Sequence, residues 1–375
     1  MKEKLRIFWK NQTVLCIAAI LAALSCFFIP PSVAYIQYIN ADTLILLFVL
    51  MGAVAGLRIC GVFQRLAEAL TKVCSNSRLL AWVMLTVCFI SSMFITNDVA
   101  LLTFVPVTLL IYTGRSDEKS HNSLIYTVIL ETAASNLGSM LLPTGNPQNI
   151  YLCSYYSITP TQLAHTLLPY GILAFTILSF ATLFIPNIVL KSRNQETHSS
   201  TSFSWRIAIS CTTIFVLALL TVSGKINAII CLGVSVALLL LSTPKTFAKI
   251  DYYLLLTFVC FFIFTGNLGK IEAVSQFLSQ LIGGREFAVS VASSQIFSNV
   301  PAAILLSGFT DQAQKLLLGV NIGGLGTPIA SMASLISYQL YAKENREKSG
   351  KYILIFMIFS FTMLTILCAA TCIIR

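Results

Sequence analysis

Apolar runs long enough to cross a bilayer recur along the whole chain. A transmembrane helix needs about 17–25 mostly apolar residues, and runs of this kind alternate here with short polar gaps. Uninterrupted runs lie at 13–29, 42–58, 163–190, 206–223, 226–243, 251–269 and 352–374. This pattern predicts an all-α polytopic membrane protein in which each of these runs forms a spanning helix.

Four further apolar runs are interrupted. Polar residues interrupt 78–114 and 285–311, whereas 122–156 and 313–341 contain Gly and Pro breaks. A helix can break inside a membrane only where protein or a water-filled cavity satisfies the freed backbone groups. The two arms of 78–114 are slightly short for a hydrocarbon core of about 30 Å. We therefore predict re-entrant hairpins at 78–114 and 285–311, with two full spans as the alternative, and broken transmembrane helices at 122–156 and 313–341.

The two halves of the chain repeat the same motifs in the same order. The matching pairs are Asp42 and Asp251, 91–97 and 293–299, and 136–143 and 321–328. The topology places Asp42 and Asp251 on opposite sides, so the repeats are expected to be inverted, which is typical of transporters with a midplane site. The predicted domains are a first inverted repeat (1–190), a cytoplasmic linker with an extra crossing helix (191–223) and a second inverted repeat (224–375).

Composition and charge support a membrane location. Charged residues make up 10% of the chain and hydrophobic residues 57%, with a mean hydropathy of +0.84, whereas soluble domains carry about 25% charged residues. The net charge of +10 comes from Lys and Arg in the polar gaps, nineteen on one predicted side and five on the other. This bias predicts a cytoplasmic N-terminus. The basic residues form no stripe, which argues against a nucleic-acid partner.

The sequence gives little support to metal binding or to catalysis. The eleven cysteines are scattered without a CxxC pair, and the three histidines are far apart, so we expect no metal, disulfide or cofactor. An intramembrane enzyme would need a nucleophile–base pair or paired aspartates. The Gly-rich segment 323–326 is followed by Thr327 and not by an aspartate. We expect no enzymatic activity and no catalytic residue.

The interruptions carry the chemistry expected of a binding site. Thr96, Asn97 and Asp98 lie at the first predicted hairpin tip, and Ser298 and Asn299 at the second. At such a tip the second arm starts with backbone N–H groups suited to an anion, and the first arm ends in carbonyls suited to Na⁺. The repetition favours a site over an ordinary polar turn. Asn97 and Asn299 are candidate Na⁺ half-sites.

Two carboxylates, Asp98 and Glu131, fall deep within apolar runs. An acid inside the membrane is by default a functional hypothesis, so both are candidates for carrying a coupling proton. Their counterparts in the second half are Val300 and Leu316, so this role belongs to one half only. Asp98 is the stronger candidate, and a structural role for Glu131 stays open.

The same motifs resemble a known superfamily. The stretch 94–101 is similar to the F-x-x-N-D-x-A-L signature of arsenite permeases, and 298–302 to their N-N-x-P-x segment. The stretches 136–149 and 321–331 are similar to the paired Gly- and Pro-containing loops of the superfamily. The chain thus resembles the ion-transporter superfamily of arsenite permeases, NhaD-type Na⁺/H⁺ antiporters and DASS-type dicarboxylate carriers. It is especially similar to YbiR-like inner-membrane proteins with a citrate-transporter-like domain.

This resemblance implies an elevator carrier of the bacterial inner membrane, usually a homodimer, with a substrate and ion site at the tips and loops. By motif match the site residues are Ser92, Thr96, Asn97, Asp98, Asn136, Gly138, Thr144, Gly145, Asn146, Ser294, Ser298, Asn299, Asn321, Gly326, Thr327 and Ser331. The chain departs from the pattern at some of these positions. Asp98 and Val300 replace two threonines of the carboxylate carriers, and Asn146 replaces an aspartate common in antiporters and arsenite permeases.

The sequence therefore predicts a secondary active transporter for a small anion, either an inorganic oxyanion or a carboxylate, coupled to H⁺ or Na⁺. The alternative is a Na⁺/H⁺ antiporter that carries no anion. The expected partners are the small anionic solute, the lipid bilayer and a second copy of the chain.

Overall fold

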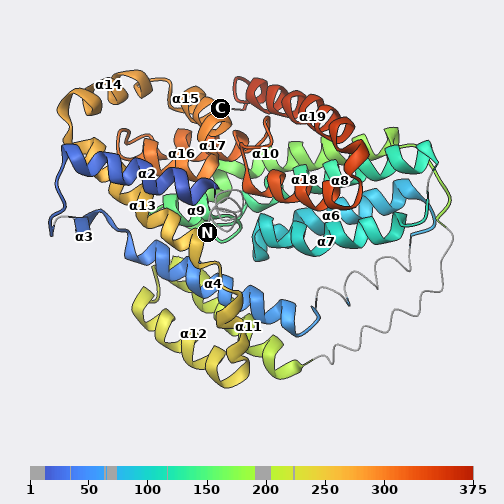
Figure 1. Ribbon diagram of the computed structural model, residues 1–375, viewed down its shortest axis with the longest axis horizontal. Helices are drawn as coiled ribbons and strands as arrows, with labels where there is room; N and C mark the ends of the chain where they lie inside the picture. The colour runs from blue at the N-terminus through green and yellow to red at the C-terminus, as the bar shows by residue number, and fades with distance from the viewer. Residues whose placement is uncertain are drawn as a thin grey trace, which may run out of the picture.

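The computed structural model describes residues 13–33, 35–62, 65, 74–115, 117–190, 204–222 and 224–374. The regular structure of these residues is helical, apart from one isolated bridge between Asn76 and Val189. Figure 1 shows long helices running in roughly one direction across the molecule. The predicted all-α architecture is confirmed.

The uninterrupted apolar runs form the expected helices. They are α2 (Thr13–Phe28), α4 (Ala41–Ile59), α10 (Pro160–Ala181), α11 (Trp205–Val222), α12 (Ala228–Ser242), α13 (Tyr252–Lys270) and α19 (Ser349–Ala370). Six of the described helices are long and apolar enough to cross a membrane, and three shorter ones are also apolar. The run predicted at 163–190 ends earlier as a helix, because α10 passes into a short 3-10 turn, η1 (Thr182–Phe184), followed by extended chain.

The interrupted runs are broken where the sequence indicates. The first hairpin consists of α6 (Ser77–Ile95) and α7 (Asn97–Tyr112), and the second of α15 (Glu286–Phe297) and α16 (Asn299–Ser307). The broken helices are α8 (Glu118–Ser139) with α9 (Pro147–Tyr156), and α17 (Ala313–Ile322) with α18 (Met332–Glu344). The two helices of each hairpin pack against each other. That the hairpins are re-entrant and the repeats inverted stays a prediction.

Short helices complete the fold. They are α3 (Tyr35–Tyr38), η2 (Pro244–Lys249), α14 (Glu272–Ile282) and η3 (Arg346–Lys348). Figure 1 shows α14 along the upper left edge of the molecule, next to the start of α15.

Local sequence fixes where the broken helices begin. Asp117 caps α8 by accepting hydrogen bonds from the Ser120 hydroxyl (2.7 Å) and the Ser120 backbone amide (2.9 Å), and these two bonds lower the pKa of Asp117. Asn146 caps α9 by accepting from the Asn149 amide (2.9 Å). Pro147 follows in the first turn, where its missing N–H and its fixed φ angle favour helix initiation.

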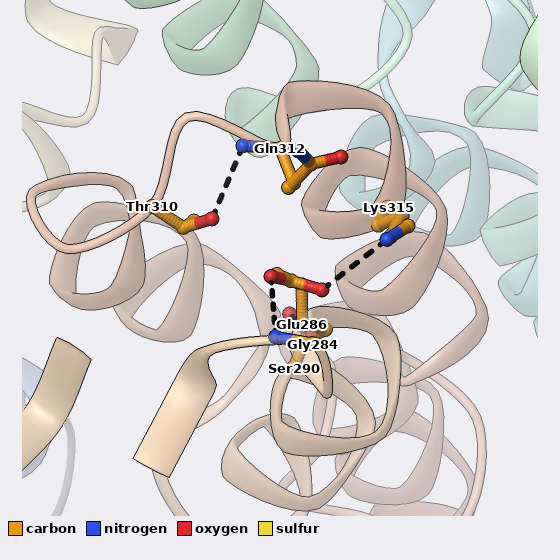
Figure 2. A network of polar contacts seen from close by, with 6 residues as sticks. All are labelled: Gly284, Glu286, Ser290, Thr310, Gln312 and Lys315. Carbon is orange, nitrogen blue, oxygen red and sulfur yellow. Dashed lines mark hydrogen bonds and ion pairs between the residues drawn. The ribbon is translucent and has the colours of Figure 1, made fainter. Parts of the chain in front are cut away.

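The base of each hairpin is held by polar contacts. At the first, the Ser77 amide donates to the Ile188 carbonyl (3.0 Å) and the Arg78 guanidinium to the Ile185 carbonyl (2.9 Å). Figure 2 shows the second base, where Glu286 accepts from the Gly284 amide (2.9 Å) and pairs with Lys315 of α17 (3.6 Å). Glu286 is only 4% exposed, so Lys315 ties the start of α15 to the adjacent broken helix.

Candidate functional site

The two hairpin tips share an unusual backbone conformation. Thr96 has φ 68° and ψ 151°, and Ser298 has φ 74° and ψ 156°. Residues other than glycine rarely adopt this region, and it costs about 1–3 kcal/mol. Each tip is followed by an asparagine that begins the second arm. The sequence therefore places a hydroxyl residue, and not glycine, where each chain reversal needs a positive φ.

Each tip docks onto the loop of a broken helix. The Asn97 amide donates to the Gly145 carbonyl (3.2 Å), and the Asn299 amide donates to the Ala330 carbonyl (2.9 Å). Both asparagine side chains accept from the next amide in the chain, at 3.0 Å in the first tip and 2.9 Å in the second. These four amides already have acceptors, so they are not free to bind an anion as the sequence suggested.

Asn136 connects the first tip to the second half of the chain. Its Oδ1 accepts from the Asn97 Nδ2 (3.2 Å) and from the Ser331 hydroxyl (2.8 Å). Its Nδ2 donates to the Ser334 hydroxyl (3.2 Å). All of these side chains are buried. Asn136 therefore holds the first hairpin tip against the start of α18, a helix that comes almost 200 residues later in the chain.

A second polar connection joins the two broken helices directly. The Asn146 Nδ2 donates to the Asn321 Oδ1 (3.0 Å), and the Asn321 Nδ2 donates to the Asn149 Oδ1 (2.7 Å). The Asn149 Nδ2 in turn donates to the carbonyls of Met140 and Leu142. Because an unpaired buried amide is costly, this reciprocal bonding fixes the relative position of the loops at 140–146 and 323–331.

The tips, the α9 and α18 ends of these loops and the start of α13 line a partly open cavity of about 130 Å³. Its polar lining comes from Asn97, Asp98, Gln148, Asp251, Thr257, Ser298, Asn299, Ser331 and Gln339. Over the described part of the chain, no Lys or Arg lines it. Two of its oxygens, the Asp98 Oδ1 and the Gln148 Oε1, are buried and accept no hydrogen bond from the residues that the structure describes. The cavity therefore presents two unpaired acceptors, one of them a carboxylate oxygen, and a second carboxylate at Asp251 that caps α13.

The predicted site residues occupy three different places. Lining the cavity are Asn97, Asp98, Ser298, Asn299 and Ser331. Behind these, Asn136, Asn146 and Asn321 form the hydrogen-bonded frame described above. Thr96 forms the first tip, while Ser92, Gly138, Thr144, Gly145, Ser294, Gly326 and Thr327 lie in the surrounding helices and loops without lining the cavity. Glu131 lies elsewhere in α8 and is bonded by Thr108 of α7.

Four polar residues of the cavity were not predicted. Gln148 follows the first loop, Asp251 and Thr257 belong to the start of α13, and Gln339 belongs to α18. Gln148 could have been found from its place in the Asn146–Asn149 motif. Asp251 was recognised only as the start of a spanning run, because nothing in its local sequence shows that α13 begins beside the tip of α7.

Gln295 was also missed, although it fixes the second loop. Its Nε2 donates to the carbonyls of Gly323 and Leu325 (both 2.8 Å), and its Oε1 accepts from the Thr327 amide (2.9 Å). A Cβ at Gly326 would lie 2.2 Å from this Oε1, and Gly326 has φ +105°. A side chain at Gly326 is therefore disfavoured for two reasons: the positive φ angle would be strained, and the Cβ would collide with the bonded Gln295 amide.

Replacing Gln295 with leucine is expected to destabilise the protein by about 3 kcal/mol, because three backbone groups of the loop lose their partner. Thermal unfolding in detergent measures the change. Met93 lies three residues before Thr96, as Gln295 lies three before Ser298, so Met93→Leu is the matched control and is expected to cost less than about 1.5 kcal/mol. Equal unfolding midpoints for the two variants would show that Gln295 does not hold the loop.

Comparison with known proteins agrees with this architecture. A bundle of spanning and broken helices around a partly open cavity that carries polar groups from both broken-helix loops is typical of a helical membrane transporter. The sequence model of the CitMHS citrate transporter family matches residues 5–315. The chain belongs to this family, as the resemblance at the tips and loops indicated.

Individual relatives support the same class. An uncharacterized transporter of Methanocaldococcus jannaschii is 35% identical over 271 residues, which is 71% of each chain. The inner membrane protein YbiR of Escherichia coli is 29% identical over 310 residues, which is 80% of each chain. Among solved structures, the YdaH transporter of Alcanivorax borkumensis shares the fold, with a TM-score of 0.57 at 14% identity over 98% of this chain and 96% of the other. The chain is thus a multi-pass membrane transporter.

Proposed function

We propose that this transporter is a secondary active carrier that moves a small anion together with H⁺ or Na⁺. The observation that carries the proposal is the convergence of both hairpin tips on one cavity, framed by residues of both halves of the chain. Paired tips of this kind suit alternating access to a midplane site. The small cavity volume of about 130 Å³ suits an oxyanion or a short carboxylate.

The charge of the cavity supplies a reason for coupling. Asp98 and Asp251 line it without a Lys or Arg among the described lining residues. A unit negative charge about 5 Å from an ionised carboxylate is repelled by about 3 kcal/mol at an effective dielectric constant of about 20, which is roughly a hundredfold in affinity. A proton or Na⁺ at the carboxylate removes this repulsion. The anion therefore binds well only when the coupling cation is present.

The same acceptors favour one second candidate, a Na⁺/H⁺ antiporter that carries no anion. The unpartnered Asp98 Oδ1 and Gln148 Oε1 are hard oxygen ligands of the kind Na⁺ prefers, and a carboxylate can exchange Na⁺ for H⁺. This candidate explains the absence of basic residues from the described lining, but it leaves the size of the cavity without a role.

The proposal also extends to the assembly and its motion. In an elevator mechanism the hairpins and broken helices would move as one unit against α2, α4, α11, α12 and α13. The buried bonds Asn146–Asn321 and Asn136–Ser331 support such a unit, because they join the two halves through the site itself.

We propose a homodimer in the bacterial inner membrane. Its N-terminus is cytoplasmic in this proposal, because the Lys and Arg residues of the polar gaps gather on that side.

Transport by the purified protein in liposomes tests the proposal. An imposed pH gradient or Na⁺ gradient is combined with arsenite, sulfate, phosphate, succinate or citrate. We expect accumulation of one of these anions under one of the two gradients and none in protein-free liposomes. Collapse of the pH gradient by Na⁺, without flux of any anion, would instead establish the antiporter.

A further inference from the structure

Glu131 is a buried acid that the cavity does not use. Its side chain is 0% exposed, and it does not line the cavity. The Thr108 hydroxyl donates to its Oε1, while its Oε2 has no partner among the described residues. The titratable groups that act on it electrostatically are Cys88 of α6, Tyr112 of α7 and Tyr352 of α19. Within the described part of the chain it forms no ion pair.

Burial without a cation favours the protonated form of this carboxyl group. Moving an ionised carboxylate from water to an apolar interior costs several kcal/mol unless a partner charge compensates. One hydroxyl donor offsets only about 1.5–3 kcal/mol of this cost. Glu131 thus has a reason to hold a proton, and that proton needs a path to water.

Hydroxyl groups line a path that starts beside Glu131. The next residue, Thr132, shares a hydrogen bond with Ser337 of α18 (2.6 Å), and Ser337 shares one with the Tyr352 phenol (3.0 Å). The Tyr352 ring stacks on Tyr341, with centroids 4.6 Å apart and planes at 22°. A hydroxyl can both accept and donate a proton, so Thr132, Ser337 and Tyr352 can pass one on along their hydrogen bonds, whereas Tyr352 and Tyr341 meet through their rings.

The path ends at a histidine beneath a charged surface. The Tyr341 phenol is hydrogen-bonded to the His121 Nε2 (2.7 Å), and His121 is 8% exposed. Three residues earlier in α8, Glu118 forms an exposed ion pair with Lys351 (3.4 Å), and Lys348 and Lys351 both act on His121 electrostatically. Glu131 follows His121 by ten positions in α8, which corresponds to about 15 Å along the helix axis. Imidazole exchanges protons readily near neutral pH, so His121 is a suitable entry point.

We propose that Glu131 is a proton-binding site that exchanges with solution at the Glu118–Lys351 face through Thr132, Ser337, Tyr352, Tyr341 and His121. In each step one O–H or N–H bond breaks and another forms, without electron transfer, and the proton leaves to water. Water would bridge Glu131 to Thr132 and Tyr352 to Tyr341, two pairs that no hydrogen bond joins among the described residues. This route is separate from Asp98. The proton site itself does not depend on the proposed function. Only its link to transport does, because there Glu131 would give the carrier a second proton site, which protons reach from one face of the protein.

Infrared spectroscopy of the protein in lipid tests the site without any transport assay. In an Asp98→Asn background, which removes the acid of the cavity tip, we expect a carbonyl band of a neutral buried carboxyl group that shifts in D₂O. Glu131→Gln should abolish this band, and Glu118→Gln, a surface change on the same helix, should leave it in place. Thr108→Val keeps the acid but removes its donor, so it should move the band without abolishing it.

The rate of the D₂O shift tests the route. His121→Gln and Tyr341→Phe are each expected to slow it on the order of tenfold or more, while the band itself remains. A band that survives Glu131→Gln would overturn the site. If Glu131→Gln does not fold, a band that Thr108→Val leaves unmoved would overturn it instead. Unchanged rates in both route variants would overturn the path. A liposome assay without flux, but with the band present, would reject the proposed function and keep the proton site.

Discussion

Asp98→Asn is expected to reduce gradient-driven uptake to the level of protein-free liposomes. Asparagine matches the shape of aspartate but cannot release a proton, so a carrier that cycles H⁺ at this position loses its net coupled step. Exchange of labelled for unlabelled substrate needs no proton release. We expect exchange to persist within about tenfold of the wild-type rate, which corresponds to about 1.4 kcal/mol in binding.

The comparison of net uptake with exchange makes this prediction specific. Asp311→Asn is the matched control, because Asp311 is an exposed acid in the connection between α16 and α17, and both rates should be unchanged. Asp251→Asn separates the two acids of the cavity. Net uptake that survives Asp98→Asn but disappears in Asp251→Asn would show that Asp251, at the start of α13, is the coupling acid and that Asp98 is not.

Gly138→Ala is expected to destabilise the protein by about 3 kcal/mol or more, since overpacking at a rigid contact forces the backbone to move. A Cβ at this position would lie 2.2 Å from the Phe89 carbonyl oxygen and 2.7 Å from the Ser92 hydroxyl. The nearest atom belongs to the backbone of α6, so no change of rotamer can make room. The first hairpin must shift relative to α8, which also displaces its tip at Thr96.

Thermal unfolding and transport together check this expectation. Gly233→Ala in α12 is the control, because a Cβ there meets nothing within 4 Å, and its effect should stay within about 1 kcal/mol. A wild-type unfolding midpoint for Gly138→Ala would mean that α6 and α8 do not approach each other this closely. Transport lost without loss of stability would instead show that the tip position alone is sensitive.

Hydropathy and motif repetition were sufficient to locate the helices and their interruptions. Apolar length decides whether a segment spans, and Gly, Pro and polar residues inside a run mark where a helix ends. The breaks near Thr96, Ser298, Pro143 and Pro328 were therefore visible in the sequence. The Lys and Arg gaps predict the orientation, but the helices themselves do not reveal which side is cytoplasmic.

The contacts around the site could not be predicted in the same way. The bond between Asn146 and Asn321 joins residues 175 positions apart, and no local pattern specifies such a pair. Asp251 enters the cavity because α13 packs near the tip of α7, which is a property of the tertiary fold. The role of Gln295 depends on the path of the loop it binds. Polar residue types thus indicate a site, while packing decides which of them meet.

The strained tips at Thr96 and Ser298 have a consequence for attempts to engineer this transporter. Glycine would relieve both φ angles, yet the chain keeps a hydroxyl residue at each turn and tolerates the conformational cost. Selection for heat resistance would therefore favour glycine at these two positions, whereas selection for function would favour the hydroxyl residues. A library screened only for survival on heating should enrich glycine at 96 and 298, and the same library screened for transport activity should reject it.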